Sequence, residues 1–315
     1  MSDYHLHLHP HADLPGAPPP GVYPDGYIDR YVEVAAARGV AELGFTEHLY
    51  RCVESEAVFG NWWESDRSLP AQVLSEMERV VRAERNLSLE RYVEVVLEAK
   101  ARGLPVKLGL EVDFEPGTEQ AVLDLIAPYP WDFLVGSVHW IGGWDFTRPQ
   151  GPTEFARRGV ERAWREYFGL ETELAAAHMV DVLAHADVIK KAGYRPPAGL
   201  LADLYAPVVA AAAASGVAVE VSSAGLRRES KEIFPAPSFL AMFRGAGVPI
   251  TLASDGHMAE DAAWGHDLVV AAARACGYDT YLRFDRRRAI VTALPTAMAG
   301  AADGPFDPGL DQSLA

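Results

Sequence analysis

Histidine and aspartate side chains crowd the first residues of the chain. In an extended strand alternate side chains lie on one face, so a strand at the N-terminus presents the imidazoles of His5 and His7 side by side. Pro10 cannot donate a hydrogen bond to a neighbouring strand and ends this one, which leaves His11 and Asp13 on the loop that follows. This arrangement predicts a metal site, the alternative being a buried structural pair of histidines.

Further ligand-type side chains follow predicted strands along the rest of the chain. Six of the seven predicted strands end in, or just before, a histidine, a glutamate or an aspartate. In a barrel of parallel strands the carboxyl ends converge on one face, where active sites are built. We therefore expect the following residues to be neighbours in space: His5, His7, His48, Glu111, His139, His185, Asp255 and His257.

The predicted ligand atoms are nitrogen and oxygen, which suit Zn, Mn or Fe ions. They outnumber the ligands of one ion, so we expect a multinuclear site that activates water and holds the oxygens of a phosphoryl group. Glu111 lies in an otherwise apolar strand, where its carboxylate needs a metal or a partner such as arginine. Three histidines are expected on the surface or in an outer layer of the site: His9, His178 and His266.

Composition narrows the class of protein. The 315 residues are 49% hydrophobic, which is enough for a large core. A formal net charge of -16 argues against a general nucleic-acid or membrane-surface binder, yet it is compatible with a small anionic substrate in a metal-lined pocket. The two cysteines form no CxxC pattern and suit a reducing cytoplasm. We find no signal segment and no apolar run of about 18 residues, so we expect neither export nor a membrane span.

Short apolar runs alternate with longer helical patterns, which is typical of strand-then-helix units around a parallel sheet. The clearest helical patterns cover Tyr27–Arg38, Leu89–Arg102, Glu154–Ala177 and Ala262–Cys276. Several helices stop at a glycine just before the next strand, as left-handed C-caps require. The predicted strands cover Asp3–Leu8, Ala41–Thr46, Val106–Asp113, Asp132–Val138, Met179–Ala184, Val217–Ser222 and Pro249–Ser254.

The long connections and the C-terminal end complete the predicted organisation. The loops at Pro15–Gly26 and His48–Leu69 are long enough to serve as lids or pocket walls. After Leu294 the chain turns to alanine, glycine, proline and aspartate. We expect one domain over residues 1–294 and a poorly ordered tail over residues 295–315.

An ordered set of motifs resembles the polymerase and histidinol phosphatase (PHP) family of metal hydrolases, in its histidinol-phosphatase branch. The resemblance runs from Asp3 to about Leu294, nearly the whole chain. Its most specific motifs are DYHLH at 3–7, GFTEH at 44–48, GLEVD at 109–113, GSVHWI at 136–141 with GWDF at 143–146, ADVIKK at 186–191, EVSSAGLR at 220–227 and SDGH at 254–257.

The resemblance implies a distorted, TIM-like (β/α)7 barrel that holds three divalent metal ions at the C-terminal ends of its strands. Glu111 would bridge two of these ions. The third ion would also bind one residue of the first loop, either His11 or Asp13, and His11 is favoured because imidazole is the usual ligand there. At matching positions the first ion would take His5, His7, Glu111 and Asp255, the second Glu111, His139 and His185, and the third His48 and His257.

The resemblance also implies a phosphate-binding arginine at Arg227. A guanidinium matches the oxygens of a phosphoryl group, although a salt bridge from Arg227 to Glu220 or Glu229 is the alternative. Its neighbour Arg228 is expected in solvent. Two further residues are expected to contact substrate, namely Lys190 and Trp140. Lys191 is a second candidate beside Lys190, the alternative for this lysine pair being a solvated helix start. Trp140 is expected to form the walls of a pocket for an imidazole ring with Trp62, Trp63 and Trp144, the alternative being that these tryptophans cap the core.

The expected reaction is hydrolysis of L-histidinol phosphate to L-histidinol and phosphate, a step of histidine biosynthesis in the cytoplasm. Asp255 would orient the attacking nucleophile or accept its proton, and Arg227 and Glu111 complete the expected catalytic set. The alternatives are hydrolysis of another small phosphomonoester, a nuclease, and an inert metal-binding protein. The expected partner is a small molecule, with no nucleic acid and no membrane, and the oligomeric state is left open.

Overall fold

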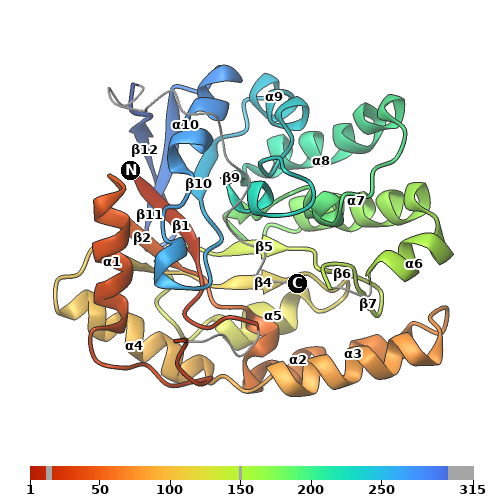
Figure 1. Cartoon of the computed structure of the whole chain (residues 1–315), viewed down its shortest axis with the longest axis horizontal. Helices are drawn as coiled ribbons and strands as arrows, with labels where there is room; N and C mark the ends of the chain where they lie inside the picture. Colours follow the sequence, from red (N-terminus) through yellow and green to blue (C-terminus); the bar gives the residue numbers. More distant parts are fainter. Residues whose placement is uncertain (12–15, 149–150, 297–315) are drawn as a thin grey trace.

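Parallel strands form the centre of the protein. The computed structural model describes residues 1–11, 16–148 and 151–296, and it shows an α/β fold (Figure 1). A three-stranded parallel sheet has the order β1-β2-β3, with strands at Ser2–Leu6, Glu42–Phe45 and Val106–Leu108. A five-stranded parallel sheet has the order β10-β9-β8-β5-β4, with strands at Ile250–Ala253, Ala218–Ser222, Val182–Leu183, Val135–Ser137 and Glu111–Asp113.

All seven predicted strands are present, but the prediction of one continuous strand over Val106–Asp113 was wrong. The segment divides at Gly109 into β3, which pairs with β2, and β4, which pairs with β5. A Cβ on Gly109 would lie 2.6 Å from the Phe133 ring and 2.8 Å from the Phe45 carbonyl oxygen. Only glycine allows this close approach, so the chain can pass here from one sheet to the other.

The two sheets meet at the carboxyl ends of their strands. The His7 N–H donates to the Gly256 carbonyl at 2.8 Å, beyond the ends of β1 and β10. On the other side the Glu111 N–H donates to the Glu47 carbonyl at 3.0 Å, next to the isolated bridge between His48 and Glu111. These contacts bring together the residues that follow strands in both sheets.

Helices surround the strands. Helices α1 (Tyr27–Ala37) and α4 (Leu89–Ala101) lie where they were predicted, whereas the helix predicted over 154–177 divides at Gly159, whose φ is 88°. The predicted glycine C-caps are confirmed, because Gly39, Gly103, Gly216 and Gly247 all have positive φ. The other helices are α2 (Glu56–Phe59), α3 (Ala71–Glu84), α5 (Glu119–Ile126), α6 (Gly151–Arg158), α7 (Val160–Ala176), α8 (Leu201–Ser215), α9 (Pro237–Gly245) and α10 (His266–Ala275).

The segment Ala198–Ser215, which contains α8, is long and apolar enough to cross a membrane by composition alone. In the structure it is a helix of the α/β fold that packs beside α7 (Figure 1). Its inner face is buried in the main core through Leu204, Tyr205, Val208 and Ala212.

A hairpin near the C-terminal end was not predicted. Strands β11 (Thr280–Asp285) and β12 (Arg288–Ala293) form an antiparallel pair. The ring centroid of Phe284 in β11 lies 6.1 Å from that of Phe133 and 6.3 Å from that of Tyr4. The hairpin therefore packs against strand residues in a second, smaller hydrophobic core. Of the predicted tail, residues 297–315 lie outside the described residues.

Candidate metal centre

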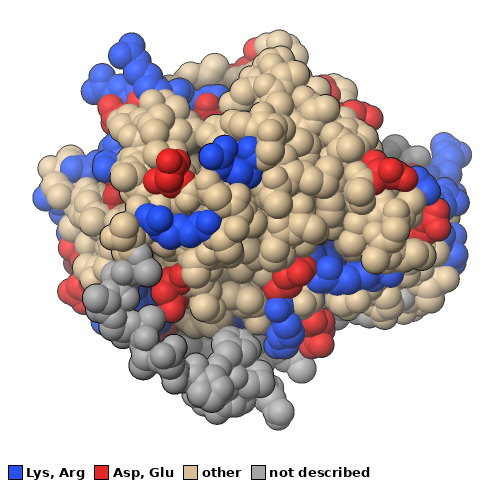
Figure 2. Space-filling model, turned by 90° about the horizontal axis from the view of Figure 1, so that it is seen from above, with Lys and Arg blue, Asp and Glu red and all other residues tan. Residues whose placement is uncertain are grey.

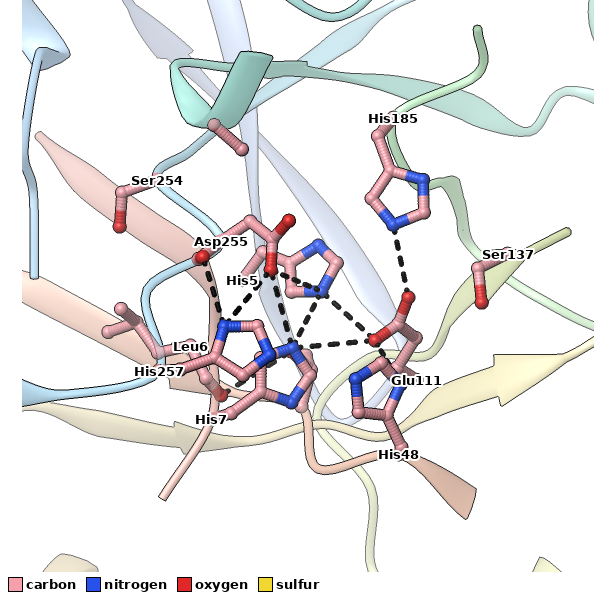
Figure 3. A network of polar contacts seen from close by, with 12 residues as sticks. His5, Leu6, His7, His48, Glu111, Ser137, His185, Ser254, Asp255 and His257 are labelled. Atoms are coloured by element: carbon pink, nitrogen blue, oxygen red, sulfur yellow. Dashed lines mark hydrogen bonds and ion pairs between the residues drawn. The ribbon is translucent and has the colours of Figure 1, made fainter. Parts of the chain in front are cut away.

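Residues that follow different strands converge on one cluster (Figure 3). His5 lies in β1 and His7 directly after it, and Glu111 begins β4. The strands bring their side chains together because the carboxyl ends of parallel strands meet at one end of the sheet. The remaining members follow β2, β5, β8 and β10, and they are His48, His139, His185, Asp255 and His257.

Glu111 lies at the centre of the cluster, and each of its carboxylate oxygens faces a different group of imidazoles. Oε2 lies 2.8 Å from His48 Nδ1, 3.2 Å from His5 Nε2 and 3.4 Å from His7 Nε2. Oε1 lies 3.2 Å from His185 Nε2 and 3.5 Å from His139 Nε2. A fully buried carboxylate with two such faces can bridge two cations.

Asp255 forms a second acidic point of the cluster. Its Oδ1 lies 3.6 Å from His7 Nε2, 3.7 Å from His257 Nδ1 and 3.8 Å from His5 Nε2. The backbone φ angles of Asp255 and His185 are 51° and 27°, in a region that residues other than glycine rarely adopt. Such backbone costs about 1–3 kcal/mol and is concentrated at functional sites.

Charge inside the cluster favours ionised carboxylates. Burial alone would raise the pKa of Glu111, but the neighbouring His48 and His5 outweigh burial and hold that pKa well below its usual range. Burial would likewise raise the pKa of Asp255, and His5 and His7 hold it well below its usual range. Both carboxylates are therefore negative and available as ligands at neutral pH.

The donor set fits divalent metal ions. Three pairs of Nε2 atoms face each other at 3.1 to 3.3 Å, in His5 with His7, His139 with His185, and His48 with His11. Imidazole nitrogens this close share a proton or a cation, and nitrogen and carboxylate oxygen are ligands that zinc prefers. Ligand atoms lie within 4.8 Å of one another in four groups: His7, His48 and His257; His5, His7 and Asp255; His5, Glu111 and His185; His48, Asp113 and His139.

Buried carboxylates lie behind three of the imidazoles, next to their Nδ1 atoms, and two of these carboxylates are within hydrogen-bond distance. Glu220 Oε2 lies 2.7 Å from His5 Nδ1, and Asp113 Oδ1 lies 2.8 Å from His139 Nδ1. Glu47 Oε1 lies 3.6 Å from Nδ1 of the third imidazole, that of His7. A carboxylate at Nδ1 fixes the ring and leaves Nε2 free to bind a metal. Sequence analysis gave these three acids no such role.

The sequence matches a known protein family over most of its length. A model of the PHP domain matches residues 5–224. The chain belongs to the PHP domain family. A Deinococcus radiodurans protein named as a probable histidinol-phosphatase is 30% identical over 227 residues, which are 72% of this chain and 78% of that protein. A histidinol-phosphatase of Lactococcus lactis is 24% identical over 271 residues, which are 82% of this chain and 84% of that protein.

Two solved structures share the fold. One is the histidinol phosphate phosphatase of Lactococcus lactis, solved with Zn, L-histidinol and phosphate, with a TM-score of 0.64 and 20% identity. The structural match covers 92% of this chain and 98% of the Lactococcus lactis chain. The other is a candidate histidinol phosphatase from Listeria monocytogenes, with a TM-score of 0.65 and 16% identity over 85% of this chain and 99% of its own. The α/β arrangement of this PHP chain is thus that of both structures.

The first loop of the PHP chain carries one predicted ligand into the cluster. His11 Nε2 lies 3.2 Å from His48 Nε2, and the two ring centroids are 4.8 Å apart. The alternative ligand, Asp13, lies outside the described residues. His9 is buried with Nδ1 3.5 Å from Glu47, and His266 is buried with Nε2 3.0 Å from the Ser2 carbonyl oxygen.

A cavity of about 450 Å³ opens beside the cluster. Its wall includes several metal-ligand candidates and Trp140, whose contact with substrate stays a prediction. Trp63 and Trp144, by contrast, are buried in the core, where they are 1% exposed. Four cationic side chains also line the cavity, namely Arg148, Lys191, Arg227 and Arg228, and Arg148 is paired with Glu84 and Asp145.

The assignment of Lys190 to substrate binding is contradicted by its surroundings. Its side chain is fully buried, and its ammonium contacts Asp187 Oδ2 at 2.8 Å, Glu232 Oε2 at 2.9 Å and the Ile233 carbonyl at 2.7 Å. These acceptors use all three of its N–H donors. Its neighbour Lys191 faces the cavity instead, because adjacent residues of this short helical turn point in different directions.

The expectations for the two arginines also change. Arg227 lines the cavity but pairs with Asp261 at 2.6 Å, not with Glu220 or Glu229, and donates to the Ser254 carbonyl at 2.6 Å. Arg228 was expected in solvent and instead lines the cavity. Desolvation lowers the pKa of Arg228. Within the described residues no side-chain hydrogen bond or ion pair is found for Arg228.

Proposed function

We propose that this PHP chain is a metal-dependent phosphomonoesterase that hydrolyses L-histidinol phosphate to L-histidinol and phosphate. The two-sided environment of Glu111 carries the proposal, because it suits a bridging carboxylate between divalent ions. Relatives named as histidinol-phosphatases, and a similar fold solved with Zn, L-histidinol and phosphate, support this choice of substrate.

We assign the ligands of three ions as the family resemblance implies, with His11 as the loop ligand of the third. Ions bound there would lower the pKa of water and neutralise charge on the phosphoryl group. Which of Zn, Mn or Fe binds depends on supply as well as on the ligands. The bridges between the two sheets also support a single distorted seven-stranded barrel around the site. The two free cysteines support a reducing compartment such as the cytoplasm.

The cationic wall of the cavity supplies a place for the phosphoryl group. Lys191 and Arg228 present positive charge close enough for Arg228 to lower the pKa of Lys191. A phosphate dianion between these side chains would relieve their repulsion and accept their hydrogen bonds. Arg227 is already held by Asp261 and by the backbone carbonyls of Ser254 and Asp255, so it orients the Asp255 loop as well as the substrate.

Asp255 is the acid best placed to handle the proton of the attacking water. Its carboxylate is kept ionised among the histidines and lines the cavity. It can therefore accept a proton as the water attacks phosphorus. Trp140 and Tyr50 line the same cavity and offer apolar surface to the organic part of the ester.

A nucleic-acid substrate is less compatible with the surface. On the face in Figure 2, lysine and arginine side chains are dispersed among uncharged residues and beside acidic ones, without forming a continuous stripe. Nucleic-acid binding needs clustered positive charge along the path of the backbone. With a formal net charge of -16, the protein suits a small ester that enters the cavity.

Phosphate release from several esters tests the proposal. We expect metal-loaded enzyme to favour L-histidinol phosphate over glucose 6-phosphate, AMP and phosphotyrosine by orders of magnitude in kcat/KM. Replacing Lys191 and Arg228 together by alanine should reduce kcat/KM for L-histidinol phosphate by roughly a hundredfold or more, since two charge-assisted contacts of about 1.5–3 kcal/mol each are lost. Preference for another ester would leave only the phosphomonoesterase class, and no turnover would favour the inert metal-binding protein.

The pH dependence of kcat/KM should report Lys191. Burial, followed by repulsion from Arg228, lowers the pKa of Lys191 to about 8. Below this pH the ammonium is charged and binds phosphate, so kcat/KM should fall as pH rises through about 8. Lys191→Arg keeps its charge throughout this range, so the alkaline fall should move to higher pH in that variant. Identical pH profiles of the two enzymes would contradict this role of Lys191.

A further inference from the structure

The loop ligand His11 has an orienting carboxylate of its own, and this one comes from outside the sheets. The carboxylates behind His5, His7 and His139 all lie in strands or directly after them. His11 instead contacts Glu84, the last residue of helix α3, with 3.3 Å between His11 Nδ1 and Glu84 Oε2. Helix α3 packs along the edge of the molecule below the strands in Figure 1.

Glu84 is held in place by several donors. Its side chain is only 9% exposed, and its Oε2 accepts hydrogen bonds from the Tyr50 hydroxyl and, at 2.6 Å, from Arg148 Nη2. Burial would raise the pKa of Glu84, but Arg148 outweighs burial and lowers it. A carboxylate in the last turn of a helix opposes the helix dipole. The contacts with Tyr50 and Arg148 compensate for this unfavourable position of the Glu84 carboxylate.

The contact with Glu84 determines which nitrogen of His11 faces the metal centre. When Nδ1–H donates to Glu84, the lone pair of Nε2 is free, and Nε2 lies 3.2 Å from His48 Nε2. The His11 ring centroid lies 4.8 Å from that of His257. The backbone before the ring is also held, because Arg51 donates to the His9 carbonyl at 2.8 Å and to the Pro10 carbonyl at 3.0 Å.

We propose that Glu84 is the positioning residue for His11, and that it makes the affinity of the third metal ion depend on the packing of α3 against the site. This inference rests on the proposed function, in which His11 is the loop ligand of that ion. The other orienting carboxylates belong to the strands and do not move with α3. The third ion should therefore be the one that is lost first when α3 or Glu84 is disturbed.

Counting bound zinc tests this inference without measuring turnover. Wild-type protein, Glu84→Gln, Glu84→Asp and His11→Ala are loaded with zinc and dialysed against buffers of graded free zinc, and bound zinc per chain is determined. Glu78→Gln is the matched control, because Glu78 lies on the same helix and, within the described residues, its ion pair is with exposed Arg82 at 2.9 Å. Thermal melting of each metal-free variant separates loss of an ion from loss of the fold.

We expect Glu84→Gln to lose one ion at a free zinc concentration about 10- to 100-fold higher than the wild type does, while the other ions stay bound. Glu84→Asp keeps the charge, so it should lose this ion at a free zinc concentration between those of the wild type and Glu84→Gln. His11→Ala should lose the same ion. Glu78→Gln should bind zinc as the wild type does. The inference is overturned if Glu84→Gln binds every ion within about twofold of wild type, if it weakens all ions equally, or if His11→Ala keeps the full complement. Failure of the proposed function would be seen separately, as wild-type enzyme with full zinc that releases no phosphate from L-histidinol phosphate.

Discussion

Glu111→Gln is expected to lower kcat/KM for L-histidinol phosphate by a thousandfold or more, equivalent to about 4 kcal/mol of transition-state stabilisation. The wild-type carboxylate offers one oxygen to His5, His7 and His48 and the other to His139 and His185. A carboxamide keeps the size but loses the charge, and it turns a donor N–H₂ toward one of these groups. Steady-state phosphate release together with bound metal per chain measures the effect, and both should fall.

A matched control for Glu111→Gln is Glu90→Gln, which removes an exposed acid in the first turn of α4. The control should keep wild-type metal content and activity, since Glu90 is exposed to solvent. If Glu111→Gln retained full metal content and more than about a tenth of the activity, Glu111 would not be a bridging ligand. The assignment of the first two ions would then fail.

Removal of metal is the second change with a large expected effect. Dialysis against a strong chelator should reduce phosphate release by at least about a hundredfold, and adding back Zn or Mn should restore it. The melting temperature should also fall, because ions that bind only the folded state stabilise it by about 2.7 kcal/mol at a free concentration of 100 Kd. Circular dichroism should still show the α/β fold, since the main core is apolar and independent of the ions.

The result that would contradict this prediction is metal-free protein, verified by elemental analysis, with unchanged turnover. Such an outcome would require side chains alone to supply the chemistry, and the cluster would then be structural. A fall in activity without recovery on adding metal would instead indicate irreversible unfolding. Refolding in the presence of zinc would distinguish that case.

Local pattern explains how much of the fold was predictable. The seven predicted strands and the glycine C-caps follow from short apolar runs and from glycine at positive φ, which are properties of a few adjacent residues. The division of the third predicted strand at Gly109 and the C-terminal hairpin were missed. Both depend on packing against the distant Phe133 ring, which no local window of sequence contains.

For the site, the sequence by itself determined which side chains gather, because ligand-type residues directly follow strands whose carboxyl ends must converge. Only the tertiary structure decided which groups orient them and which cations face the cavity. Glu220 and His5 are 215 residues apart and yet share a hydrogen bond, and Lys191 faces the cavity while adjacent Lys190 is buried. The physical reason is that chain direction and side-chain period are local properties, whereas the partner of a buried charge is set by packing between distant segments.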